Sequence, residues 1–189
     1  KKTRYDIRKS EENNFEFEVA KKRTDLAKYG KLKDSFKQKA GETVVSLPSF
    51  HDSHWEYLQK KGYEKLFLAV HNGKSIAGIL TLAFNGTLIQ HGVVNSSQQN
   101  LSGSFLTWNA IKWAINNGYQ RFDMGGFNPN PESEKEKAID FYKSKWGSEK
   151  IIYNTFTKIV SSTKLKIANV LINPNRLKKK ISNVINNNV

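Results

Sequence analysis

The chain has 189 residues, of which 38% are hydrophobic and 12% aromatic, and its formal net charge is +14. This composition supports a folded core and excludes an intrinsically disordered chain. The absence of cysteine excludes disulfides and thiolate chemistry, and the longest apolar runs are too short to cross a bilayer.

Basic residues concentrate at the two ends of the chain. Residues 1–40 carry 13 Lys and Arg against 7 Asp and Glu, and residues 161–189 carry 6 against none. Basic ends favour a polyanionic partner, so we expect contact with tRNA or with an anionic membrane surface. A basic surface that serves only solubility is the alternative. Since no signal segment is visible, we expect a cytoplasmic protein, peripheral to the membrane if the tail binds lipid.

The first half of the chain predicts a strand, two helices and three further strands. Residues 15–20 alternate in polarity, which is typical of a strand. Residues 24–39 have helical apolar spacing, and residues 51–62 predict a shorter helix. The pairs Asn72-Gly73 and Asn85-Gly86 are hairpin signals. They separate three expected antiparallel strands, near residues 65–71, 75–84 and 87–94.

The second half predicts alternating helices and strands. We expect a buried helix at about 102–117, a strand at 119–124, and a helix at 131–147 that begins with acidic residues. Residues 150–160 predict a last strand. The remaining residues, 161–189, have the pattern of a basic amphipathic helical tail.

This order of elements predicts an α/β (α+β) fold with a mixed, mostly antiparallel sheet flanked by helices. The order is similar to that of the GNAT acyltransferase fold. We therefore expect a GNAT-like domain at residues 1–160, followed by the helical tail at residues 161–189.

Two short motifs sharpen this similarity. The first, Asp-x-Gly-Gly, ends a predicted strand, and the second, Tyr-Lys-x-x-Trp-Gly, ends the helix that follows. With "LFLAVHNGKSIAGILTL" and "LTWNAIKWAINNGYQRFDMGG", they resemble the C-terminal half of the Fem family, the peptidoglycan-bridge aminoacyltransferases and their relatives. The matching residues are Asp123, Gly125, Gly126, Tyr142, Lys143, Trp146 and Gly147.

The resemblance implies an acyltransferase that moves an aminoacyl group from aminoacyl-tRNA to an amine. The acceptor would be a small-molecule or lipid-linked cell-wall or cell-surface precursor, and no cofactor is implied. Fem enzymes have two GNAT-like halves and many have a long helical hairpin, whereas this chain has one half and no hairpin. Because it also begins with Lys, we expect a fragment whose partner is an N-terminal GNAT-like half, or a relative with another acceptor.

The resemblance implies that Lys143 stabilises the oxyanion formed on the acyl carbonyl, as a fixed cation does. From the residues themselves, Lys143 lies between Tyr142 and Trp146, and we expect these rings to hold its ammonium group and to contact substrate. The alternative is a surface lysine that extends over aromatic core residues.

Asp123 and the two glycines after it form the second part of the predicted site. An acid at the end of a central strand can orient a substrate amine or accept its proton. The alternative, which we favour, is that Asp123 caps the following loop or pairs with Lys143 or Lys145. Gly125 and Gly126 allow either a close approach to a ligand or an ordinary turn.

The loop "QNLSGS" stands where a CoA-dependent GNAT enzyme holds the pyrophosphate. Gln99 fits the family pattern, but Ser102 and Ser104 stand where Gly and Gly or Ala are expected, and Gly103 is out of register. We expect this loop to bind an anion weakly, and the mismatch favours a donor other than acetyl-CoA. His51 and His54 have helical metal-ligand spacing without a third ligand, so we expect no metal.

Two other functions stay open at this stage. The first is an acyl-CoA-dependent N-acyltransferase acting on an amino sugar or another small amine. The second is a non-catalytic half-domain that binds RNA or a membrane through its basic tail.

Overall fold

The computed structural model describes residues 2–39, 41, 52–95, 101–152, 158 and 161–164. The chain divides into two compact units, Lys1–Ser148 and Glu149–Val189. The sheet and every contact discussed below belong to the first unit. The boundary predicted at residue 160 falls outside the described residues and stays a prediction, as does the helical character of most of the tail.

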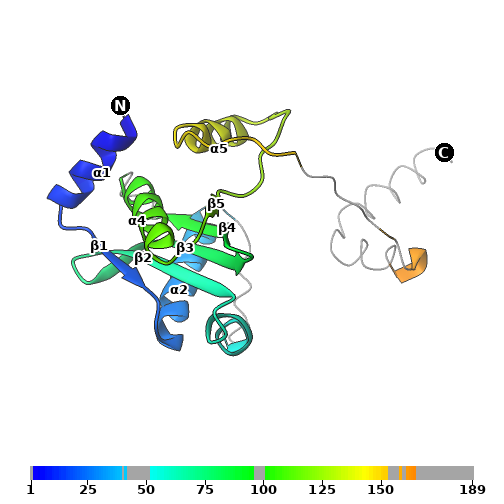
Figure 1. Cartoon of the computed structure of the whole chain (residues 1–189), viewed down its shortest axis with the longest axis horizontal. Helices are drawn as coiled ribbons and strands as arrows, with labels where there is room; N and C mark the ends of the chain where they lie inside the picture. The colour runs from blue at the N-terminus through cyan, green and yellow to red at the C-terminus, as the bar shows by residue number, and fades with distance from the viewer. Residues whose placement is uncertain are drawn as a thin grey trace, which may run out of the picture. The chain divides into compact units, whose positions relative to one another are not determined.

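One five-stranded sheet has the order β1-β2-β3-β4-β5 (Figure 1). Neighbouring strands run antiparallel from β1 to β4, and β5 pairs parallel to β4. This confirms the predicted mixed, mostly antiparallel sheet. Asn72 and Asn85 both have positive φ in the tight turns on either side of β3, as the hairpin signal requires. The strands are β1 Glu16–Val19, β2 Glu64–His71, β3 Lys74–Phe84, β4 Thr87–Asn95 and β5 Arg121–Asp123.

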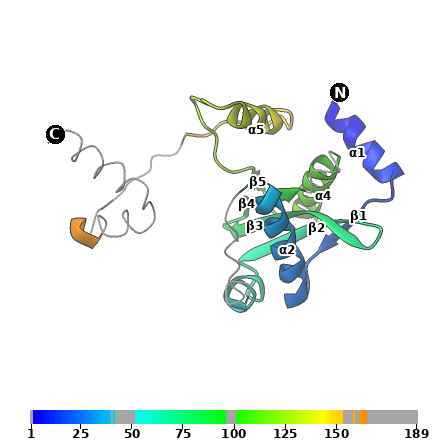
Figure 2. The ribbon, with the colours of Figure 1, turned by 180° about the vertical axis from the view of Figure 1, so that it is seen from behind.

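Helices cover both faces of the sheet. Figures 1 and 2 show α4 on one face and α2 on the other. The sequence pattern predicts no helix at the N-terminus. The structure has the helix α1 there, packed against α4. It was missed because most residues of α1 are charged. The Ser10 side chain is fully buried: its Oγ donates to the Asp6 carbonyl at 2.7 Å and also lies 3.3 Å from the Leu101 carbonyl at the start of α4. The helices are α1 Lys2–Glu12, α2 Arg23–Lys39, the π-helix η1 Trp55–Gln59, α4 Ser102–Asn116 and α5 Glu134–Ser144.

The core has two apolar layers, one on each face of the sheet, because successive strand side chains point in opposite directions. In β2, Phe67 joins the layer under α4, whereas Leu66 and Leu68 join the layer under α2. All three side chains are almost fully buried. This two-sided burial explains why β2 and β3 read as nearly continuous apolar runs.

Tyr29 of α2 packs against two glycines of the sheet. A Cβ atom added at Gly78 would meet Tyr29 Cδ2 at 2.6 Å, and one added at Gly92 would meet the Tyr29 hydroxyl at 2.5 Å. The two glycines therefore provide the room into which the ring packs. Burial, with the negative charge of Glu64, raises the pKa of Tyr29 to about 12.

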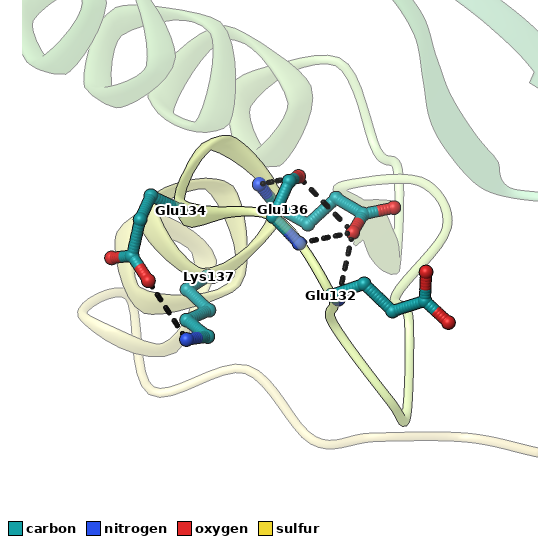
Figure 3. A network of polar contacts seen from close by, with 5 residues as sticks. Glu132, Glu134, Glu136 and Lys137 are labelled. Atoms are coloured by element: carbon teal, nitrogen blue, oxygen red, sulfur yellow. Dashed lines mark hydrogen bonds and ion pairs between the residues drawn. The ribbon is translucent and has the colours of Figure 1, made fainter.

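A capping box begins α5, the helix that carries the Tyr-Lys motif. Ser133 accepts a hydrogen bond from the Glu136 N–H at 3.2 Å, and the Glu136 carboxylate accepts the N–H groups of Ser133 and Glu132 (Figure 3). The hydrogen bonds that the carboxylate accepts, above all the one from the Ser133 N–H, lower the pKa of Glu136. Such a box satisfies otherwise unpaired N–H groups and fixes where the helix starts.

Two strands predicted near the end of the domain differ from those in the structure. The strand expected at 119–124 is confirmed only as the three residues of β5. The strand expected at 150–160 lies largely outside the described residues, and Lys150–Ile152 within it are not in a strand.

We predict that Gly78→Ala destabilises the protein by roughly 1–3 kcal/mol, the usual cost of overpacking a core. The added methyl group would overlap the Tyr29 ring. Urea unfolding measures the effect, and the same substitution in a Tyr29→Ala background provides the control. An equal loss of stability in both backgrounds would show that the ring contact is not the cause.

Candidate active site

The strands β4 and β5 part after three residue pairs. Their parallel pairing ends where Ile89 faces Asp123. Over the rest of β4, residues 90–95, no described strand pairs with this edge. Backbone groups of an unpaired strand edge are available to bind an extended ligand.

A cavity of about 280 Å³ lies beside this open part of β4. Its walls come from the adjacent strand, the first turns of α4 and one residue of α5. Apolar side chains form most of the wall, and a few polar groups converge on it, as is usual for small-ligand sites. The lining residues are Ala77, Ile79, Gln90, Val93, Val94, Asn95, Gly103, Ser104, Leu106, Thr107 and Tyr142.

Gln90 supplies an unsatisfied acceptor in this wall. Its Oε1 atom is buried and has no hydrogen-bond partner among the described residues. A buried unpaired polar atom costs free energy, so an N–H group of a ligand in the cavity would be stabilised there. No motif in the sequence indicated Gln90.

Tyr142 supplies the hydroxyl group of the cavity. This hydroxyl donates to the Gly103 carbonyl at 3.1 Å and lies 3.0 Å from Thr107 Oγ1. Burial raises the pKa of the phenol, although the hydrogen bond with Thr107 acts in the opposite direction. The phenol therefore keeps its proton at neutral pH. Tyr142 was predicted as a substrate-binding residue; it lies in the cavity wall, and its contact with substrate stays a prediction.

Asp123 caps the loop that follows β5. Its Oδ1 accepts the Gly125 N–H at 2.7 Å, and no ion pair joins it to Lys143 or Lys145 within the described ranges. This is the capping role favoured from the sequence, and the ion-pair alternative is not supported. The catalytic role of Asp123 stays a prediction.

Gly125 holds this loop against β4. Its φ is +78°, and an added Cβ would lie 2.9 Å from the Gln90 carbonyl oxygen. A side chain at this position would thus be both conformationally strained and in collision with backbone. Gly126, in contrast, has open space around it and a φ outside the left-handed region.

Lys143 binds the same loop from α5. Its ammonium group donates to the Gly126 carbonyl, and it is half-buried. The expectation that Tyr142 and Trp146 hold this ammonium is wrong, because the carbonyl is its partner and the rings contact one another edge-on at 6.1 Å. Lys143 nevertheless lies beside the loop Asp123–Gly126, so the two sequence motifs are close together in the structure. Lys143 does not line the cavity.

Two buried serines lie in the first turn of α4, and no described side chain forms a capping hydrogen bond with the start of this helix. Ser102 is fully buried and donates to the Asn95 side-chain oxygen, while Ser104 is buried in the cavity wall. Gln99, the third residue predicted for this loop, lies outside the described residues. Ser102 and Ser104 are thus placed at the site, with Ser102 engaged in a bond within the protein.

Trp146 lies in a second hollow, a groove of about 1050 Å³ between α1, the outer side of α4 and the end of α5. The groove contains three cations and three aromatic rings, and no acidic side chain lines it. We call it the basic groove. Its lining residues are Thr3, Arg4, Tyr5, Ile7, Arg8, Trp108, Lys145 and Trp146.

No group of three His, Asp or Glu residues in the described ranges is arranged to hold a metal ion. His51 lies outside these ranges. His54 is instead 2.7 Å from the carboxylate of Glu64.

The acetyltransferase (GNAT) domain pattern matches residues 1–144, well over half of the chain. The chain belongs to the GNAT acetyltransferase domain family. The five-stranded sheet and its flanking helices agree with that assignment, and acyl transfer is the activity of the family. No curated protein sequence is similar enough to count as a relative.

Solved GNAT structures share this fold at low sequence identity. An aminoglycoside acetyltransferase from an uncultured soil metagenomic sample, solved with trehalose, is 17% identical with a TM-score of 0.57, covering 78% of this chain and 97% of that chain. FemX is 13% identical with a TM-score of 0.65, and the match covers 78% of this chain but only 53% of FemX. Aminoglycoside N-acetyltransferase AAC(6')-Iy, solved with CoA, is 13% identical with a TM-score of 0.57, covering 78% and 96% of the two chains.

In the part of this GNAT chain that the structure describes, no helix is both long and apolar enough to cross a membrane.

We predict that Gly125→Ala destabilises the domain by roughly 1–2 kcal/mol, the cost of a left-handed alanine, and that the collision with the Gln90 carbonyl adds to it. Gly126→Ala is the matched control and should change stability little. Chemical unfolding of the two variants compares them directly. Equal stabilities would contradict the close approach of the loop to β4.

Proposed function

We propose that this GNAT domain is an N-acyltransferase that moves an aminoacyl group from an aminoacyl-tRNA ester to an amine. The observation that carries the proposal is the cavity at the open edge of β4, where the Tyr142 hydroxyl and the Gln90 amide converge. A polar donor and a polar acceptor in an otherwise apolar cavity suit a carbonyl compound with a neighbouring N–H group.

The residues provide the parts that acyl transfer needs. The amine attacks the carbonyl carbon, a C–N bond forms as one N–H proton passes to water, and the C–O bond to the donor breaks. The leaving oxygen takes up a proton, which the neutral Tyr142 phenol can supply once its O–H turns from the Gly103 carbonyl. We assign to Lys143 the stabilisation of the negative oxygen that forms in between, through a shift of its ammonium group from the Gly126 carbonyl.

Two features favour a tRNA ester over a CoA thioester as the donor. Ser102 and Ser104 in the first turn of α4 stand where the pattern of a CoA-binding loop has Gly and Gly or Ala, and both serine side chains are buried there. The basic groove presents aromatic rings beside cations, which suits the stacked bases and phosphates of single-stranded nucleic acid. The Lys112 ammonium nitrogen additionally lies 5.7 Å from the centre of the Trp108 ring.

The acceptor we propose is an amine on a cell-wall or cell-surface precursor, as in the Fem family, with the reaction in the cytoplasm where charged tRNA is found. The likeness to FemX is a likeness of fold, and it leaves almost half of FemX without a counterpart. An additional GNAT-like half would therefore be the partner that completes acceptor binding. The basic tail would contact tRNA or an anionic membrane surface.

An acyl-CoA-dependent N-acetyltransferase is the second candidate, and the family match itself favours it. In that reaction a C–S bond breaks and the CoA sulfur takes up the proton. The acceptor would be an amino sugar or another small amine.

Calorimetry with acetyl-CoA separates the two donors. We expect no micromolar binding, because Ser102 and Ser104 replace the Gly and the Gly or Ala of the CoA-binding pattern in the first turn of α4. Alanyl-tRNA should bind, with an affinity that falls steeply as salt increases. Micromolar binding of acetyl-CoA together with salt-independent weak binding of tRNA would favour the second candidate.

We predict that Lys143→Met lowers acyl transfer about 100-fold or more, the usual effect of removing an oxyanion-stabilising group, with little change in melting temperature. Lys137→Met is the matched control, since Lys137 lies on the same helix in an exposed ion pair with Glu134. Both variants are compared with the wild type by transfer of radiolabelled alanine to a lysine peptide amide. A Lys143→Met variant with the activity of Lys137→Met would remove Lys143 from the mechanism.

A further inference from the structure

Gln90 presents its amide to the cavity at a point where the alternation of β4 is interrupted. Gln90 faces Thr81 of β3, and the pairing then shifts register, so that His91 faces no residue. Such a bulge changes which side chains point to a given face of the sheet. As a result Gln90, Val93 and Asn95 all line the cavity, whereas an unbroken alternation would place Gln90 and Val93 on opposite faces.

The backbone at Gln90 is constrained on both sides of the strand. Thr81 pairs with it from β3. On the other side, a Cβ atom added at Gly125 would lie 2.9 Å from the Gln90 carbonyl oxygen. A residue that recognises a ligand needs a rigid support of this kind, because looseness of the support reduces selectivity.

One oxygen of the cavity wall lacks a partner. Among the buried side-chain atoms of the wall, Gln90 Oε1 is the one without a hydrogen bond within the described ranges. Other polar groups are engaged: Thr107 Oγ1 lies 3.0 Å from the Tyr142 hydroxyl, and the Asn95 oxygen accepts from Ser102. A ligand that brings an N–H group to Gln90 removes the cost of the unpaired oxygen, whereas a methyl group leaves that cost in place.

The cavity suits a small group that donates a hydrogen bond without carrying a charge. No charged side chain is among its described lining residues, so burial of an ammonium group there would be costly. An α-amino group has an ordinary pKa of about 7.7–8.0, against about 10.4 for a lysine amine. The α-amino group is therefore the amine that is readily neutral near pH 7.

The size of the cavity points to a short acyl group. Its volume of about 280 Å³ is at the lower end of small-ligand sites, which span roughly 300–1,000 Å³. An aminoacyl group carries its α-amino group on the carbon next to the carbonyl, so a cavity that takes the carbonyl also takes the amine. An acetyl group has only a methyl group in that place and would leave Gln90 Oε1 unpaired.

We propose that Gln90 selects the acyl donor. Its Oε1 accepts an N–H of the neutral α-amino group of a small aminoacyl ester, and the unpaired oxygen disfavours acyl groups that lack this amine. The assignment rests on the proposed function. Gln90 determines specificity and takes no part in bond breaking, so its loss should make donors more equal rather than abolish transfer.

The test compares two donors of the same shape on the full chain. Alanyl-tRNA and isobutyryl-tRNA differ in one group, because a methyl group replaces the α-amino group in the second. With a lysine peptide amide as the acceptor, we expect the wild type to prefer alanyl-tRNA by about 100-fold or more in kcat/KM, as a site built around a hydrogen bond does.

Gln90→Met keeps the length of the side chain and removes both of its polar atoms. We expect this variant to reduce the preference to about fivefold or less, mainly because it accepts isobutyryl-tRNA better. Its melting temperature should equal or exceed that of the wild type, since a buried oxygen without a partner has been removed. A folded variant that keeps the full preference would contradict the assignment.

Thr107→Val is the matched control. It removes a polar group from the same wall, but one that is already bonded to Tyr142. The rates with the two donors should change together, so that their ratio stays that of the wild type. A ratio that falls as far as in Gln90→Met would show that any loss of polarity in the wall has this effect, and would overturn the role of Gln90.

A binding measurement on the wild type keeps the proposal testable if Gln90→Met does not fold. The probes are 3′-deoxyadenosines that carry an alanyl or an isobutyryl group through a 3′-amide, which cannot be transferred. Calorimetry should show about 10-fold or more tighter binding of the alanyl compound. Equal affinities would overturn the role of Gln90.

The outcomes separate the two levels of the proposal. A wild type that transfers from neither tRNA overturns the proposed function and the role of Gln90 with it. A wild type that uses alanyl-tRNA and isobutyryl-tRNA equally well overturns the role of Gln90 alone, because transfer from a tRNA ester would still have been observed.

Discussion

The early separation of β4 from β5 is the constraint on which the site depends. The two strands share only three residue pairs before they part, so the rest of β4 keeps an open edge. The loop after β5 stays close to β4, because Gly125 lies against the Gln90 carbonyl. The separation therefore has a fixed size, and the cavity forms beside it.

The rest of the domain keeps these strands in place. Two apolar layers bury both faces of the sheet, and Tyr29 packs into the space that Gly78 and Gly92 leave open. From the other end, the capping box fixes the start of α5, and Tyr142 bonds to the first turn of α4. Lys143 then connects α5 to the loop after β5. The polar groups of the proposed reaction thus come from β4 and α5, and hydrogen bonds connect α5 to α4 and to the loop after β5.

The two sides of β4 have different characters. On the α4 side the cavity is mostly apolar, with Gln90 and Tyr142 as its polar groups. On the α2 side the polar groups are ionisable and centred on a buried carboxylate. An acyl donor and a basic amine have correspondingly different requirements, since a carbonyl group needs hydrogen-bond donors and an amine needs a proton acceptor. The cavity and the buried carboxylate lie on opposite faces of the sheet, so the proposed acyl site belongs to the α4 side.

Local patterns in the sequence determined most of the fold. The Asn-Gly pairs placed the hairpins, apolar spacing placed α2 and α4, and the acidic start of α5 marked its beginning, because each signal acts over a few residues. The motifs also identified Tyr142 and the loop after Asp123. Only the tertiary structure decided that the Gly126 carbonyl holds Lys143, and that Gln90 and Tyr142 line one cavity. These contacts join residues far apart in the chain, and burial and strand register, which no local pattern encodes, determine them.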